Sequence, residues 1–295
     1  MSRLLQRLLC AALAATAFIT TAGAAQAPGH HSLWMLHGAR NTVYLLGSIH
    51  LLQTQDSMLP AEMLAAYRQA DVLLMEVDPA DIGGGPQPQE VMQLMLLPAG
   101  QTLDGVVGSR LYEQVQRQAG GIGLDRDALK FTQPWYAANV IDVGYLLKHG
   151  FDPDAGVERQ LAQLASRDGK PIHALETVGQ QLGYFAAMPL DRQRSFLRET
   201  LHDLPASVKD ARAMVLAWQH GDISALERDL RRSARRNSDL PPALVDERNR
   251  KWLPQILEML DDDRDYLVVV GALHMVGETG LLRQLGLRGY AATQQ

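Results

Sequence analysis

The 295-residue chain has almost no cysteine, since Cys10 is its one thiol. A disulfide framework, a zinc site built from cysteines and a cysteine nucleophile are therefore nearly excluded. Basic residues are also in the minority, because 28 Lys and Arg stand against 33 Asp and Glu and give a formal net charge of −5. Nucleic-acid-binding domains usually carry a basic surface. The composition thus argues against a nucleic-acid partner.

The chain also lacks an apolar run long enough to cross a bilayer. The stretch over 8–20 is almost wholly apolar, but a membrane-spanning helix needs about 20 such residues. It follows the basic residues Arg3 and Arg7 and precedes Ala22-Gly23-Ala24, an order typical of a secretory signal peptide. We therefore predict a signal peptide over 1–24 and a periplasmic or secreted protein without a transmembrane segment. A mature chain without cysteine suits an oxidising compartment.

Strand and helix patterns alternate along the mature chain. Apolar runs predict strands over 42–46, 72–77, 171–175 and 266–270, and helical spacing appears over 60–70, 103–119, 134–147, 156–167, 180–202, 206–219, 224–236, 241–260 and 280–285. With 46% apolar and 21% charged residues, the composition is globular. We expect one α/β domain over 28–295, with a central sheet flanked by helices and a helical insertion at about 180–260.

One short pattern occurs twice, each time directly after an apolar strand. Gly47-Ser48-Ile49-His50 follows the first predicted strand, and Gly271-Ala272-Leu273-His274 follows the last. In open α/β sheets, residues just beyond the carboxyl ends of strands line the ligand site. Two such units in one sheet would bring His50 and His274 together. The alternative is two ordinary turn histidines, each bonded to a backbone carbonyl.

Two carboxylates occupy comparable places. Glu76 ends the apolar run Val72–Met75, and Glu176 follows Ile172–Leu175. A buried carboxylate is unfavourable unless it is paired or bound to a metal ion, although Glu76 at a strand end can also be solvated. Two histidines with one or two carboxylates can hold a divalent metal ion. The same groups can also act without metal, as general acid and base.

With these residues in this order, the chain resembles the TraB/GumN family, also called TraB/PrgY/GumN, which is related to the Tiki proteins. The resemblance covers about 33–290. It is carried by Leu46-Gly47-Ser48-Ile49-His50, Leu74-Met75-Glu76-Val77-Asp78, Pro134-Trp135, Leu175-Glu176-Thr177 with Gln181, Glu247-Arg248-Asn249 and Gly271-Ala272-Leu273-His274. The departures are mild: Ser48 replaces Thr, Met275 replaces Leu, and Gly156-Val157-Glu158 stands where the family has Gly-x-Asp. The last change leaves the role of Glu158 open.

The resemblance implies a fold shared with erythromycin-esterase-like and ChaN-like proteins, in which two G-x-x-H units face each other. Tiki members are described as metal-dependent proteases supported by manganese or cobalt, the esterase-like relatives hydrolyse with the equivalent His and Glu, and ChaN binds haem. Carried over, His50, His274 and Glu76 are the expected metal ligands. Glu76, Glu176 and Arg248 are the expected catalytic residues. Arg248 would donate to a developing oxyanion, the alternative being a solvated charge cluster.

These expectations combine into an exported hydrolase that cleaves a peptide or ester bond with a divalent metal ion: manganese, cobalt or zinc. One alternative is a non-enzymatic module that binds haem or a small ligand through the same histidines. Another is a module that sequesters a peptide, in the manner suggested for TraB and PrgY. The basic cluster Arg231–Arg236 is expected to be a solvated helix face, and contact with anionic lipid or polysaccharide is its alternative.

Overall fold

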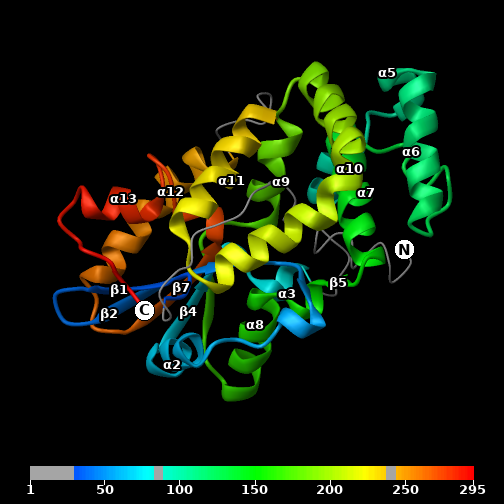
Figure 1. Ribbon diagram of the computed structural model, residues 1–295. Helices are drawn as coiled ribbons and strands as arrows, with labels where there is room; N and C mark the ends of the chain where they lie inside the picture. Colours follow the sequence, from blue (N-terminus) through cyan, green and yellow to red (C-terminus); the bar gives the residue numbers. More distant parts are fainter. Residues whose placement is uncertain (1–29, 83–88, 237–243) are drawn as a thin grey trace.

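The structure, a computed structural model, describes residues 30–82, 89–236 and 244–295, so the predicted signal peptide lies outside it. A six-stranded sheet forms its centre, in the order β6-β4-β7-β2-β1-β8 (Figure 1). In that order the strands are Ile172–Ala174, Val72–Met75, Tyr266–Gly271, Thr42–Ser48, Leu33–His37 and Thr293–Gln294. The expected α/β class, a central sheet flanked by helices, is confirmed.

The four strands β6, β4, β7 and β2 are parallel neighbours. Their carboxyl ends therefore lie at one edge of the sheet, with Ser48 of β2 opposite Gly271 of β7. Every residue of β4, and β7 up to Val270, is buried, as expected for parallel strands covered on both faces. β1 and β8 extend the sheet in antiparallel pairings beyond β2, and the sequence patterns missed both of them.

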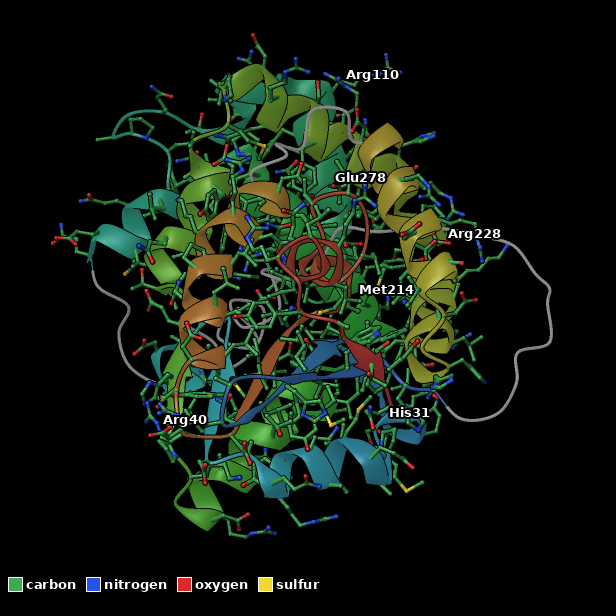
Figure 2. The ribbon with its side chains drawn as sticks, turned by 90° about the vertical axis from the view of Figure 1, so that its left-hand side faces the viewer. His31, Arg40, Arg110, Met214, Arg228 and Glu278 are labelled. Atoms are coloured by element: carbon green, nitrogen blue, oxygen red, sulfur yellow. The ribbon has the colours of Figure 1, made fainter. Side chains whose placement is uncertain are left out.

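Helices cover both faces of this sheet. In Figures 1 and 2, α2 (Ala61–Gln69) and α8 (Val157–Asp168) lie against one face, and α12 (Asp246–Leu260) and α13 (Leu281–Gly286) against the other. The remaining helices are α3 (Pro79–Ile82), α4 (Gln89–Met95), α5 (Leu103–Val107), α6 (Ser109–Gly121), α7 (Pro134–Lys148), α9 (Val178–Ala186), α10 (Leu190–Gln219) and α11 (Ile223–Arg236). Short 3₁₀ turns occur at Thr54–Asp56, Pro153–Ala155 and Ala272–His274, and β3 (Leu52–Gln53) pairs with β5 (Phe151–Asp152).

Three predicted helices have wrong boundaries. The helix expected over 180–202 is divided between α9, which ends at Ala186, and α10, which begins at Leu190. The helix expected over 103–119 is divided into α5 and α6 at Gly108, whose φ of +83° is a left-handed conformation that ends the first helix. Conversely, α10 runs without interruption through Pro205, where two helices were expected. Its apolar face, which includes Leu201 and Leu204, is buried on either side of the proline, and this packing outweighs the lost backbone hydrogen bond. The proline pair at 241–242 lies outside the described residues.

The end of α10 is tied to the strand that leads to His50. The indole Nε1 of Trp218 donates to the carbonyl oxygen of Gly47 over 2.6 Å, and Ser32 Oγ donates to the carbonyl oxygen of Trp218 over 3.0 Å. All three residues are buried. The helical region thus contacts the first G-x-x-H turn directly. No helix among the described residues is both long and apolar enough to span a membrane.

α7 and α10 pack along each other and enclose a carboxyl group. Asp142 of α7 is 5% exposed, and Asp210 of α10 is 1% exposed. Burial, together with the neighbouring negative charge of Asp210, raises the pKa of Asp142 to about 7. The interface is therefore sensitive to pH.

We predict that Asp142→Asn changes the pH dependence of stability. The folded-state pKa of Asp142 lies above its ordinary value of 3.8, so its contribution to stability is present below about pH 4 and is lost as the pH rises through about 7. The asparagine cannot ionise. In urea denaturation, the variant should therefore gain stability relative to the wild type between about pH 5 and about pH 8. Glu113→Gln, at an exposed position, is the control for loss of one charge, and a pH-independent difference for Asp142→Asn would contradict the prediction.

Candidate active site

Four of the residues singled out in the sequence follow the four parallel strands. Glu176 comes after β6, Glu76 after β4, His274 after β7 and His50 after β2. All four therefore lie at the same edge of the sheet. The space above Gly271 is where three of them meet: a Cβ placed there would lie 3.4 Å from Glu76 Oε1, 3.7 Å from His274 Cδ2 and 3.8 Å from His50 Nε2.

Arg248 of α12 reaches into this edge and is itself buried. Its Nε donates to Glu176 Oε1 over 2.9 Å, and its Nη2 lies 2.7 Å from the same oxygen and also donates to Glu76 Oε2. Its Nη1 lies 3.1 Å from His274 Nε2 and 3.2 Å from the carbonyl oxygen of Leu244. A guanidinium has five N–H donors, and four of them make hydrogen bonds here: one from Nε, one from Nη2 and two from Nη1.

This arrangement changes the role expected for Arg248. The sequence suggested an arginine that donates to a developing oxyanion. In the structure four of its five N–H groups already make hydrogen bonds, and Nη2 also lies in an ion pair with Glu176. The guanidinium carbon also lies 4.5 Å from the centre of the Trp252 ring, one helical turn further along α12. Arg248 is therefore built into the wall of the site, where it orients Glu76, Glu176 and His274.

Glu76 is a fully bonded, buried carboxylate. Its Oε1 accepts from the backbone N–H of Gly271 over 2.7 Å, and its Oε2 accepts from Gln181 over 2.9 Å and from Arg248. Burial alone would raise the pKa of Glu76, but the positive charge of Arg248, with further contributions from His274 and His50, holds that pKa well below its usual range. Glu76 is therefore charged at neutral pH.

His274 is held through both ring nitrogens. Its Nδ1 lies 2.7 Å from Asn249 Oδ1, and Asn249 Nδ2 donates to the carbonyl oxygens of His274 and Thr279, each over 3.0 Å. With Nδ1–H donating to Asn249, Nε2 carries the lone pair that accepts from Arg248. Burial, and next the charge of Arg248, lower the pKa of His274 to about 3. The ring is neutral at physiological pH.

His50 has the opposite electrostatic environment. Its Nδ1 lies 2.7 Å from Glu158 Oε1, and its side chain is 27% exposed, whereas Glu76, Glu176, Arg248 and His274 are each buried. Burial lowers the pKa of His50, but the charges of Glu158 and then Glu76 outweigh it and raise the pKa to about 9. His50 is therefore protonated at neutral pH, and it is the most exposed side chain of this group.

Glu176 contacts the same guanidinium as Glu76, but the pKa of Glu176 is raised whereas that of Glu76 is lowered. Burial raises the pKa of Glu176 to about 7, because Arg248 offsets only part of that effect and the negative charge of Glu76 adds to it. One cation thus serves two carboxyl groups, of which Glu76 keeps the charge. A carboxyl group with a pKa near 7 can exchange protons at physiological pH.

The expected metal ligands do not fit a divalent ion in this arrangement. Among the described residues, no group of three His, Cys, Asp or Glu side chains is placed to hold one. Glu76 Oε2 and His274 Nε2 both face the guanidinium of Arg248, and a second cation at that place would be repelled. His50, His274 and Glu76 would bind a metal ion only after Arg248 moved away.

Three contacts of the site had no assigned role in the sequence. Gln181, which donates to Glu76, appeared only as part of a family motif; it lies in the first turn of α9, whose start is fixed by a capping box at Thr177. Asn249 likewise appeared only as part of a family motif, and in the structure it contacts His274. The role of Glu158 was open, and it contacts His50. For Asn249, the one sequence feature that pointed to the site was its position next to Arg248.

The basic cluster lies on α11, and the site residues belong to other elements. Arg231 pairs with Glu227 over 3.0 Å and Arg232 with Asp229 over 2.9 Å, both within the same helix. Figure 2 shows Arg228 of this helix pointing outward. Arg231 is exposed, as expected for a solvated helix face, whereas the Arg232–Asp229 pair is partly buried. The side chains from 233 on lie outside the described ones.

Comparison with known proteins places the chain among related sequences. A family model described as the TraB/PrgY/gumN family matches residues 32–294. An uncharacterized protein YbaP of Shigella flexneri is 27% identical over 263 residues, which cover 87% of this chain and 94% of the relative. The uncharacterized protein YbaP of Escherichia coli (strain K12) matches with the same identity and coverage. No solved structure matches the chain.

We predict that Arg248→Met strongly lowers the free energy of unfolding, and that the loss comes from the two carboxylates that it leaves unpaired. The variant leaves Glu76 and Glu176 buried without a cation, and removing one partner of a buried ion pair costs about 3–5 kcal/mol. Adding Glu76→Gln and Glu176→Gln removes the uncompensated charges, so the triple variant should recover much of the loss. Urea denaturation of the single and triple variants measures both effects. Equal stability of wild type and Arg248→Met would show that the cluster is solvated.

Proposed function

The chain belongs to the TraB/PrgY/gumN family, and we propose that it is an exported hydrolase that cleaves a peptide or ester bond at the cluster of His50, Glu76, Glu176 and His274. The observation that carries the proposal is the meeting of His50, Glu76 and His274 above Gly271, with one partly exposed cationic imidazole beside a buried carboxylate. Neighbouring groups whose pKa values are moved apart are typical of acid–base sites. Export rests on the predicted signal peptide over 1–24.

Each residue has a role that its environment supports. His50 hydrogen-bonds through Nε2–H to the substrate carbonyl oxygen as water attacks, and it transfers that one proton to the leaving nitrogen or oxygen as the scissile bond breaks. Glu176, whose pKa lies near 7, accepts the proton of the attacking water. After the products leave, the proton that Glu176 took from water returns to His50 through solvent. Glu76 stays ionised and stabilises the positive charge of His50. Arg248 holds Glu76, Glu176 and His274 in place.

In a second form of the proposed hydrolysis, the same site acts with a bound metal ion. Manganese, cobalt or zinc would supply a Lewis acid to the substrate carbonyl. Since Glu76 and His274 are occupied by Arg248, we assign the proton transfers to the protein's own groups. The two forms differ in their response to a chelator.

We predict that His50→Gln and Glu76→Gln each lower kcat/KM by about 100-fold or more, the usual effect of losing an acid–base group or the charge that supports it. The measurement is turnover of aryl esters and of a mixed peptide pool by the untagged protein, followed by absorbance and mass spectrometry. His202→Gln, an exposed histidine of α10, is the matched control and should keep wild-type turnover.

The same samples distinguish the alternatives. Activity that is abolished by a chelator and restored by manganese, cobalt or zinc would establish the metal-dependent form and overturn the metal-free roles. A peptide that is retained by the protein but recovered intact would replace hydrolysis by sequestration. A haem absorption band in the purified protein would indicate a haem-binding module. Full turnover by both His50→Gln and Glu76→Gln would contradict the placement of the site.

A further inference from the structure

The start of α8 is packed directly against the first G-x-x-H turn. The backbone N–H of Val157 donates to the carbonyl oxygen of Ile49 over 3.1 Å. Gly156 lies so close to the carbonyl oxygen of His50 that a Cβ at this position would overlap it. A residue without a side chain is therefore required at 156. This close approach brings Glu158, the second residue of α8, next to His50.

One oxygen of Glu158 serves two donors from that turn. Ser48 Oγ donates to Glu158 Oε1, and His50 Nδ1 lies 2.7 Å from the same oxygen. The Glu158 side chain is only 16% exposed, and its Oε2 is buried without a hydrogen-bond partner among the described residues. The carboxylate also lies in the first turn of a helix, where the backbone N–H groups favour negative charge. Its contacts to side chains are thus directed at the turn that carries His50.

An imidazole ring has a broad χ2 preference, so packing alone leaves two flipped orientations open to it. A carboxylate on Nδ1 selects one of them, because only then does Nδ1–H have its acceptor. In that orientation Nε2 lies on the side of Gly271, together with Glu76 Oε1 and His274. Ser48 restrains the carboxylate in turn.

We propose that Glu158 is the positioning residue of His50: with Ser48, it holds Nδ1–H so that Nε2 is presented to the substrate. The inference rests on the proposed function, in which His50 transfers the proton. Partners of this type, one contact removed from the reacting group, typically change activity by about 10-fold to 100-fold when they are lost. Glu158 acts through His50 and does not contact the substrate.

Glu158→Leu removes the acceptor at similar size, and Glu158→Gln keeps an amide oxygen in its place. For Glu158→Leu we expect kcat to fall by about 10-fold to 100-fold with KM changed less than about twofold, because ring orientation affects proton transfer more than substrate binding. Glu158→Gln should lie between Glu158→Leu and the wild type. The matched control is Glu62→Leu, which removes another first-turn glutamate paired with a histidine, His31, and should leave kcat unchanged.

A spectroscopic measurement tests the contact without any substrate. In protein labelled with ¹⁵N-histidine, the Nδ1–H proton of His50 should give a downfield resonance that is assigned by its loss in His50→Gln. It should disappear in Glu158→Leu, weaken in Ser48→Ala and persist in Glu62→Leu. Persistence of that resonance and of wild-type kcat in Glu158→Leu would overturn the proposal.

The hydrolase and the positioning role of Glu158 can fail independently of each other in these experiments. A wild-type protein that hydrolyses none of the esters or peptides, yet shows the Glu158-dependent resonance, would refute the hydrolase and leave the His50–Glu158 contact established. If Glu158→Leu does not fold, Ser48→Ala and Glu158→Gln provide the same readouts; wild-type spectra and wild-type kcat in both would also overturn the positioning role.

Discussion

The guanidinium of Arg248 is the group on which the rest of the site depends. Glu76 and Glu176 both pair with this guanidinium. Without a neighbouring cation, neither buried carboxyl group would ionise readily. Arg248 is close enough to both to keep Glu76 charged, while Glu176 retains a pKa of about 7. Burial, and next this guanidinium, lower the pKa of His274 and keep it neutral. The charges of Glu158 and then Glu76 keep His50 protonated. Burial, one buried cation and Glu158 together set the protonation pattern of the site.

The fold explains why these groups meet. Four parallel strands end at one edge, and each is followed by one polar residue, so a single sheet collects side chains from 50, 76, 176 and 274. α12 then contributes three neighbours from one helix: Arg248 to the carboxylates, Asn249 to His274, and Trp252 beneath both Arg248 and the His274 ring, 4.6 Å away. α8 supplies Glu158 from the opposite face of the sheet.

Much of this arrangement was visible in the sequence, because strands that are buried on both faces read as continuous apolar runs and the polar residues that end them stand out. The two G-x-x-H patterns and Glu76 were singled out in this way. The order of the strands was not available, and neither were the short strands β1 and β8, which are held by pairing more than by composition. Arg248 lies 172 residues from Glu76 in the chain. Its hydrogen bonds to Glu76, Glu176 and His274 depend on long-range packing that no local pattern encodes.

The most direct test of Arg248 as the resident cation is calorimetric titration of untagged wild type and Arg248→Gln with manganese and zinc. If the guanidinium occupies the place between Glu76 and His274, the wild type should bind neither ion stoichiometrically, and Arg248→Gln should bind at least one of them roughly tenfold more tightly, because a repelling charge has been removed. A wild type that binds about one ion per chain, with affinity that falls in Arg248→Gln, would contradict this view of the site.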